Sequence, residues 1–277
     1  MSAANSDPAD NAAQLDSPSF RLAALDQDFL LGDSMRGARF LLEFSKADEA
    51  LRTWGVRSTL VVFGSARVRE DGPGRQPQWY AAAREFAALA SRRGGALLDD
   101  GATRDNVIVT GGGPGIMEAA NRGAAEAGAP SIGLNIRLPH EQEPNAFSTP
   151  ELTLRFHYFA MRKMHFAMRA NALVAFPGGF GTFDELFEIL TLRQTGRMAA
   201  IPVVLFDETY WRAVINFDAL VEAGMVERAD LELFRFAETP QGLWSTLIEA
   251  GLKVDAPSGG ALRDAPPPAG PAPERLG

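Results

Sequence analysis

Short apolar runs alternate with amphipathic segments along most of the chain. The apolar runs are rich in Val, Ile, Leu and Phe, which is typical of buried strands, whereas the segments between them repeat their apolar residues at helical spacing. Because these strands lack an alternation of apolar and polar residues, both faces of their sheet must be covered. The pattern therefore predicts an α/β fold, a doubly wound, Rossmann-like parallel sheet with helices on both faces. The strands are expected at 58–63, 106–110, 131–136, 172–176 and 201–206.

The helical segments and the two ends divide the chain into four parts. A helix at 36–55 precedes the first strand, so that 19–56 forms an N-terminal helical extension, either a small cap on the domain or an oligomer element. The α/β domain is expected at 57–254. The polar, Ala/Asp/Pro-rich start 1–18 and the Pro/Gly/Ala-rich end 255–277 are expected to be disordered tails. Within the α/β domain, helices are expected at 78–93, 116–127, 159–169, 182–193, 208–223 and 240–251.

Composition narrows the classes of protein without identifying one. Hydrophobic residues make up 46% and charged residues 22% of the 277 residues, as in ordinary globular proteins. The chain has no cysteine, which excludes disulfides, thiol nucleophiles and cysteine-ligated metals and fits a reducing, cytoplasmic compartment. The net charge of −8 argues against a nucleic-acid partner. The chain shows no secretory signal and no apolar run of the roughly 20 residues that a membrane span needs, so no membrane partner is expected.

Two glycine-rich loops lie where strands are expected to run into helices. They are Gly111-Gly-Gly-Pro-Gly115 and Pro177-Gly-Gly-Phe-Gly181. In a doubly wound sheet, ligands bind beyond the carboxyl ends of the strands, where helix N-termini favour anions. Glycine also lets the backbone approach a phosphate closely. A single loop of this kind is equally typical of a tight turn, but two at the same end of one sheet predict a phosphorylated ligand.

The spacing of the glycines favours a mononucleotide over a dinucleotide or ATP hydrolysis. In the first loop, the third glycine of a G-x-G-x-x-G motif is replaced by Ile116, and no ribose-binding acid follows at the expected distance. The chain also lacks the G-x-x-x-x-G-K-[ST] motif of P-loop NTPases. A nucleotide monophosphate is therefore the expected small-molecule partner.

The second loop is part of a longer motif. The segment Pro177-Gly-Gly-Phe-Gly-Thr-Phe-Asp-Glu185 resembles the P-G-G-x-G-T-x-x-E signature of the Lonely Guy family, the cytokinin riboside 5'-monophosphate phosphoribohydrolases. Many relatives in that family carry the label lysine decarboxylase. The Gly-Gly-Gly loop, the pair Arg162-Lys163 and the first-strand exit Gly64-Ser65 are similar to the family too. The resemblance covers roughly residues 57–225.

This resemblance implies an enzyme that needs no cofactor. It would hydrolyse the N-glycosidic bond of AMP or of an N6-substituted AMP, releasing the free base and ribose 5-phosphate. The N6 group stays open, because a prenyl group asks only for an apolar pocket. The family also implies a homo-oligomer, at least a dimer, with the Arg162 helix near the interface. Three features differ from the short plant-type members: the N-terminal extension, an insertion-like stretch at 96–105, and the continuation Pro114-Gly-Ile-Met-Glu118, which resembles the longer bacterial branch.

Glu185 and Arg162 are the expected catalytic residues. Cleavage of an N-glycoside passes through an oxocarbenium-like sugar, which a carboxylate can stabilise or attack through an activated water. The resemblance implies this role for Glu185, while Arg162 would contact the substrate and orient Glu185, a task that suits a planar, always-charged fork. Two other interpretations stay open. The segment Thr182-Phe-Asp-Glu185 also matches a helix capping box, and a lone arginine on a helix is usually a solvated charge.

Ten further residues are expected to bind the substrate. Glycine N–H groups and the Thr182 hydroxyl would face the phosphate, and Met161 could border the base. Lys163 points about 100° around its helix from Arg162, so only one of these two can aim straight at the ligand. The ten residues are Gly112, Gly113, Lys163, Gly178, Gly179, Gly181, Thr182, Ser65, Glu118 and Met161.

The lesser candidates also have ordinary structural explanations. Ser65 is typical of a turn serine and Glu118 of an acid on a helix surface. Met161, Met164 and Met168 are spaced i, i+3, i+7, which is most often a core stripe. The three histidines are scattered and have no carboxylate cluster around them, so no metal is expected.

Two other functions are possible for a chain of this pattern. A binding protein of the same fold for a nucleotide or a pterin, as in molybdenum-cofactor carriers, would not need Glu185, so the complete signature favours the enzyme. A decarboxylase would need a lysine that forms a Schiff base with pyridoxal phosphate. Lys46 and Lys253 are expected in peripheral helices, which leaves only Lys163, and no other cofactor signature accompanies it. The decarboxylase label is therefore rejected.

Overall fold

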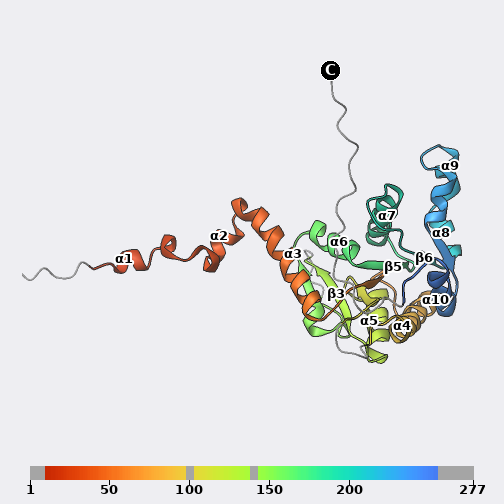
Figure 1. Ribbon diagram of the computed structural model, residues 1–277, viewed down its shortest axis with the longest axis horizontal. Helices are drawn as coiled ribbons and strands as arrows, with labels where there is room; N and C mark the ends of the chain where they lie inside the picture. Colours follow the sequence, from red (N-terminus) through yellow and green to blue (C-terminus); the bar gives the residue numbers. More distant parts are fainter. Residues whose placement is uncertain (1–9, 98–102, 138–142, 255–277) are drawn as a thin grey trace, which may run out of the picture.

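A computed structural model describes residues 10–97, 103–137 and 143–254 (Figure 1). The expected tail at 255–277 lies outside these residues, and so do the first nine residues of the expected N-terminal tail and the middle of the insertion-like stretch 96–105. Seven parallel strands form one sheet in the order β4-β3-β2-β1-β5-β6-β7, which confirms the predicted fold class. The strands are β1 (Thr59–Phe63), β2 (Val107–Thr110), β3 (Ser131–Ile136), β4 (Thr153–Phe156), β5 (Ala170–Ala175), β6 (Val203–Phe206) and β7 (Arg235–Ala237).

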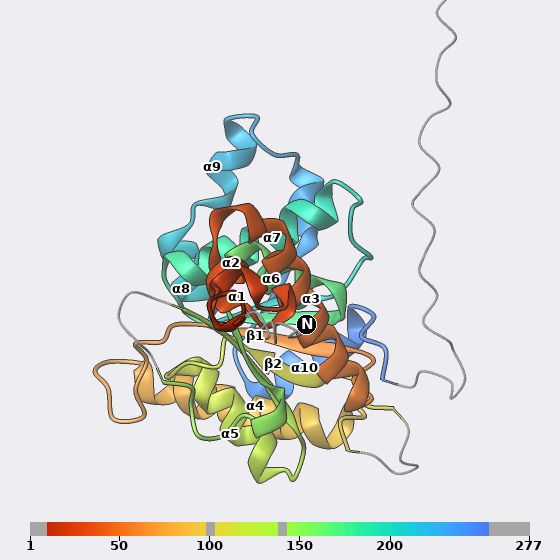
Figure 2. The same cartoon turned by 90° about the vertical axis from the view of Figure 1, so that its left-hand side faces the viewer.

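Helices cover both faces of this sheet, as the unbroken apolar strands require (Figure 2). Alternate residues of β1 point to opposite sides: Leu60 and Val62 belong to one buried cluster, and Val61 and Phe63 to the other. The first cluster is completed by α4 (Gln76–Arg93), α5 (Ile116–Glu126) and α10 (Pro240–Glu249). The second is completed by α3 (Arg36–Thr53), α6 (Phe159–Met168), α7 (Phe180–Gln194), α8 (Glu208–Val214) and α9 (Phe217–Glu222).

Several boundaries differ from the sequence predictions. The single helix expected at 208–223 is two helices, because the chain is extended at Ile215 and Asn216 then caps α9 by accepting a hydrogen bond from the N–H of Ala219 (3.1 Å). The helix expected from Thr182 begins two residues earlier, at Phe180. This small shift matters, because it places Thr182 inside the first turn of α7 rather than at its cap.

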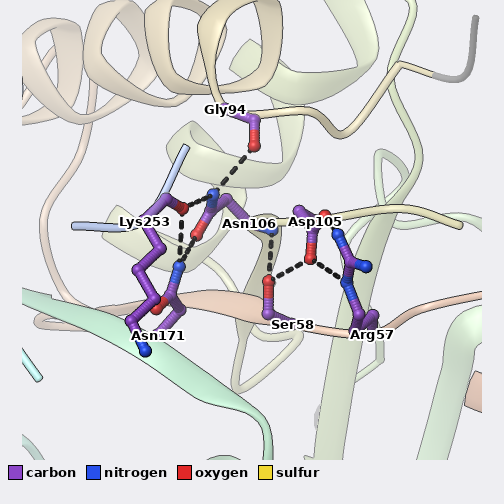
Figure 3. Close-up of polar contacts among 7 residues, drawn as sticks. All are labelled: Arg57, Ser58, Gly94, Asp105, Asn106, Asn171 and Lys253. Carbon is purple, nitrogen blue, oxygen red and sulfur yellow. Dashed lines mark hydrogen bonds and ion pairs between the residues drawn. The ribbon is translucent and has the colours of Figure 1, made fainter. Parts of the chain in front are cut away.

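The amino ends of the central strands are joined by a polar network around the buried Asn106 (Figure 3). Asn106 has a left-handed backbone (φ 51°), and its amide donates to the carbonyls of Gly94 (2.8 Å) and Lys253 (2.9 Å). Asn171 donates to the Asn106 side chain (2.7 Å) and also to the Lys253 carbonyl (2.9 Å). The network ties the segment after α10 to the bottom of the sheet, so the prediction that Lys253 lies in a helix is wrong. The network lies at the amino ends of the strands, whereas the glycine loops lie at their carboxyl ends.

Residues 10–35 form an arm that projects from the domain (Figure 1). It contains α1 (Ala12–Leu15) and α2 (Gln27–Leu31), and none of its helical residues is buried. Arg39 of α3 anchors the base of the arm by donating to the carbonyls of Leu30 (2.8 Å) and Gly32 (2.6 Å). None of the helices in the described part of the chain has the length and apolar character that crossing a membrane requires.

Candidate functional site

The glycine loops meet where the strand order of the sheet reverses. The chain runs outward from β1 through β4 on one side and returns to place β5 on the other side of β1. A crevice beyond the carboxyl ends of β1 and β5 is therefore the expected ligand site of a doubly wound sheet. Ser65, at the exit of β1, joins the two loops: its N–H donates to the carbonyl of Pro177 (3.1 Å), and its own carbonyl accepts from the N–H of Ile116 (3.1 Å). The Ser65 hydroxyl accepts from the N–H of Arg67 (3.0 Å), as expected for a turn serine.

The first glycine loop is held rigidly by its own chain. Gly112 has φ +72° and a Cβ there would overlap the amide of Asn135, so glycine is required. Its N–H donates to the Thr110 hydroxyl (3.0 Å), so this group is already occupied. Asn145 clamps the loop from above, donating its backbone N–H to the carbonyl of Gly112 (2.8 Å) and its amide to that of Gly113 (3.0 Å). Gly112 and Gly113 thus lie beside the crevice, as a fixed wall.

A buried polar chain extends beneath this loop. Asn121 of α5 accepts from the Thr110 hydroxyl (2.7 Å) and from the Asn145 amide (2.9 Å), and donates to the Ser131 hydroxyl (2.9 Å). Neither Asn121 nor Asn145 was singled out from the sequence. A signal existed for Asn121, a polar residue on the otherwise apolar, alanine-rich face of its helix. Asn145 lies in a connecting segment, and nothing in the sequence marks it.

The second glycine loop leads directly into α7. A Cβ at Gly178 would overlap the side chain of Thr182, which is buried against the loop. Gly179 is the N-cap residue, and the space around it and Gly181 is open. The first N–H groups of a helix have no partner within the helix, so the loop and the start of α7 present donors toward the crevice. The carbonyl of Gly178 points toward α8, where it accepts a hydrogen bond from the hydroxyl of Tyr210 (2.6 Å).

Glu185 and Arg162 meet between α6 and α7. The guanidinium of Arg162 donates from Nη2 to Oε1 of Glu185 at 2.7 Å, and the two side chains are 11% and 13% exposed. The capping-box interpretation of Thr182 and Glu185 is wrong, because Thr182 lies within the helix and Glu185 binds Arg162 instead. The solvated-charge interpretation of Arg162 is wrong for the same reason. Burial raises the pKa of Glu185 to about 7, even though the positive charge of Arg162 opposes this shift.

Arg162 also connects Glu185 to the first glycine loop. Its guanidinium carbon lies 5.3 Å from the ring centre of Phe159 and 5.7 Å from that of Phe166. A Cβ built on Gly111 would lie 3.7 Å from its Nη1 atom. The guanidinium of Arg162 therefore lies beside the first loop and pairs with Glu185 on α7. Its buried Nε–H has no partner among the described residues.

Lys163 points away from this pair, as its position on the helix predicts. Its ammonium binds Asp184 (2.7 Å) and Glu188 (3.3 Å) on the outer side of α7. Burial works against the charge, but these two carboxylates outweigh it, and the net effect raises the pKa of Lys163. A Schiff-base lysine needs the opposite shift. A contact between Lys163 and a phosphate would require the ammonium to leave both carboxylates.

A groove of about 500 Å³ opens on the same outer side of α7. Its charged residues are Lys163, Asp184 and Glu188, and the rest of its lining comes from α7: Phe180, Phe183, Phe187, Thr191 and Leu192. Neither Glu185 nor a residue of the first glycine loop lines it. The groove is therefore separate from the place where the two loops meet.

The remaining candidates are placed less centrally. Glu118 is half-buried and accepts from the hydroxyl of Tyr80 (2.8 Å), so it is more than a surface acid. Met161 packs against the core, but Met164 and Met168 are 42% and 50% exposed, so the predicted core stripe is wrong. The described part of the chain holds no group of three or more His, Cys, Asp or Glu side chains that could bind a metal.

Fold and loops together define the class of this protein: a doubly wound α/β protein whose two glycine loops flank the switch point of its sheet. The family described as "Possible lysine decarboxylase" matches residues 117–247. The chain is 29% identical over 199 residues to the probable cytokinin riboside 5'-monophosphate phosphoribohydrolase LOG4 of Oryza sativa subsp. japonica, covering 70% of this chain and 78% of the rice protein. It is 28% identical over 148 residues to the phosphoribohydrolase LOG3 of Arabidopsis thaliana, covering 52% of this chain and 67% of that one. These matches confirm the resemblance to the Lonely Guy family.

A solved structure is similar as well. The molybdenum cofactor carrier protein from Chlamydomonas reinhardtii is 21% identical, with a TM-score of 0.47, and the match covers 70% of this chain and 98% of that one.

Proposed function

We propose that this protein hydrolyses the N-glycosidic bond of AMP or of an N6-substituted AMP. The observation that carries the proposal is the buried Glu185–Arg162 pair beside two glycine loops. Burial raises the pKa of Glu185 to about 7 although the charge of Arg162 acts to lower it. A carboxyl group poised near neutrality in a crevice is typical of acid–base catalysis.

The chemistry follows from the bond that is broken. As the bond between C1' of the ribose and the base nitrogen breaks, its electron pair leaves with the base and positive charge develops on the sugar. The Glu185 carboxylate stabilises this charge and accepts a proton from the water that attacks C1'. The proton then passes from Glu185 to the departing base, which leaves as the neutral free base. Arg162 holds Glu185 in place and offers its remaining donors to the substrate.

The phosphate would bind at the second loop. The open N–H groups at Gly179 and Gly181 and the positive end of α7 favour a phosphate dianion. Gly112 and Gly113 would form the opposite wall, where Asn145 holds them. Ser65 lies between the two loops and fixes the distance between them.

Product analysis of the purified protein tests the proposal. It would be incubated with AMP, N6-isopentenyl-AMP and the matching riboside, and the free base would be separated by chromatography. Release of base from the monophosphates but not from the riboside is the expected result, because only the monophosphates offer a ligand to the second loop. Absence of base from all three, with AMP still bound, would overturn the hydrolase and leave a nucleotide-binding protein.

We also propose that the arm joins copies of this chain. Eight large apolar side chains between residues 15 and 42 are exposed, including Leu22 (72%) and Leu25 (75%). A segment that buries none of its own helical residues does not offset the entropy of ordering it, and so much apolar surface is typical of an interface. Changing Leu22 and Leu25 together to Asp is expected to reduce the mass measured by light scattering to that of one chain, 29.8 kDa. The control is Ile248→Asp on α10, which is also exposed. A single-chain mass for the unaltered protein would contradict the proposal.

A further inference from the structure

Tyr210, at the start of α8, contacts the second glycine loop although it lies outside the signature motif. Its hydroxyl donates to the carbonyl of Gly178 at 2.6 Å. The hydroxyl comes from beyond β6, 32 residues away in sequence, and reaches the loop after β5. The contact therefore joins two neighbouring strand exits at the carboxyl edge of the sheet.

Because a peptide bond is planar, the contact with the Gly178 carbonyl also fixes the direction of the Gly179 N–H. The chain has no cis peptide bond among its described residues, so the carbonyl of Gly178 and the N–H of Gly179 point in opposite directions. A carbonyl held toward Tyr210 therefore turns the Gly179 N–H away from Tyr210. This N–H donates to no acceptor within the described part of the chain, and the space beside Gly179 is open. Tyr210 thus orients a free donor at the N-terminus of α7.

Tyr210 is itself held by a buried carboxylate. Asp207 is fully buried with φ +72°, an unusual backbone conformation for a residue other than glycine. Its side chain accepts from the backbone N–H of Tyr210 (3.1 Å) and from the indole N–H of Trp79 (2.8 Å). The rings of Trp79 and Trp211 pack edge-on against the tyrosine ring, with centres 5.6 and 5.5 Å away. The strained residue and the two indoles leave the phenol little freedom to turn.

We propose that Tyr210 is a positioning residue for the phosphate of the substrate. By holding the peptide between Gly178 and Gly179, it keeps the Gly179 N–H aimed at the 5'-phosphate of a nucleotide. The inference rests on the proposed function, in which the second loop binds that phosphate. Without the hydroxyl, the glycine peptide is free to rotate, and the donor is ordered only when the ligand binds.

Tyr210→Phe tests this role, because it removes one oxygen and keeps the ring. AMP and adenosine binding would be measured by calorimetry in the Glu185→Gln background, so that no substrate is consumed. The expected result is an affinity for AMP about 5- to 10-fold lower, as for one lost hydrogen bond, with the affinity for adenosine unchanged. In the active protein, KM for AMP rises by the same factor while kcat stays within about twofold. Tyr158→Phe is the matched control, since its hydroxyl contacts Arg39 and not the loop.

The outcomes separate this inference from the proposed function. If AMP binds but Tyr210→Phe leaves the ratio of AMP to adenosine affinity unchanged, the positioning role is overturned and the hydrolase stands. An equal loss for both ligands, with a lower melting temperature, would show a structural role only and overturns the inference as well. If the parent protein neither binds AMP nor releases base, the proposed function fails first.

Discussion

Glu185→Gln is expected to lower kcat for base release by about a thousandfold or more. The substitution keeps the shape of the side chain and its hydrogen bond from Arg162, but removes the negative charge and the proton acceptor. A positioned acid–base group contributes on the order of 10²–10⁴ to a rate, and the lost charge adds to this at an oxocarbenium-like centre. AMP affinity should change by less than about threefold, because the phosphate contacts belong to the glycine loops. Single-turnover kinetics and calorimetry on the same sample measure the two quantities.

The matched control for this variant is Glu249→Gln. Glu249 ends α10 on the opposite face of the sheet and is exposed, so its neutralisation should leave kcat unchanged. If Glu185 served only as a hydrogen-bond partner of Arg162, glutamine would replace it well, since its amide oxygen still accepts from the guanidinium. A Glu185→Gln variant with nearly full activity would therefore contradict the catalytic role.

The pH dependence gives a second test of the same residue. Burial raises the pKa of Glu185 to about 7, and the carboxylate is the form that stabilises the sugar cation. The value of kcat/KM should therefore rise about tenfold per pH unit below pH 7 and level off above it, because this ratio reports the free enzyme. The second ionisation of the substrate phosphate lies near 6 and contributes a separate step. In Glu185→Gln, the step near 7 should vanish and the phosphate step should remain; persistence of both would assign the upper step to another group.

The strands could be predicted where most of their residues are buried and therefore apolar. The five strands predicted from the apolar pattern are the five inner strands of the sheet, whose residues are mostly buried. The two strands that the pattern missed, β4 and β7, lie at the sheet edges. There Thr153–Phe156 alternates buried and exposed residues, and Arg235–Ala237 is only three residues long. Neither segment is apolar enough to differ from a loop.

The location of the site was predictable, but its contacts were not. Loops that follow parallel strands must share one edge of the sheet, so the meeting of Gly111–Gly115 with Pro177–Gly181 follows from the fold. The pairing of Arg162 with Glu185 depends on how two helices pack, which no local pattern encodes. The start of α7 was predicted two residues late because the whole glycine-rich run to Gly181 was assigned to a loop, whereas the helix begins at Phe180. Tyr210 reaches the loop only through the order of β5 and β6, so the sequence contained no signal for it.

Arg162→Ala is expected to lower kcat/KM at pH 7 by about a hundredfold or more. The guanidinium is the positive charge nearest to Glu185 and opposes the effect of burial on its pKa. Its removal leaves a buried carboxyl group without its partner, so the pKa of Glu185 rises further above 7 and less of the reactive carboxylate is present at neutral pH. The substrate also loses a forked donor. A pH profile of kcat/KM separates these two effects: the raised pKa of Glu185 shifts the rising step, and the missing donor lowers the plateau.

For Arg162→Ala, the result that tests the role of the guanidinium is the pH at which kcat/KM rises, and not the size of the fall in kcat/KM. The step should move to higher pH, and part of the activity should return above the original step, where the carboxylate of Glu185 forms without Arg162. Arg162→Lys supplies the control: its charge should hold the step near 7, while the missing fork keeps the plateau below that of the unaltered protein. A step that stays near 7 in the alanine variant would mean that Arg162 does not set the charge of Glu185. Its contribution would then lie in substrate contact alone, through the donors that face the first glycine loop.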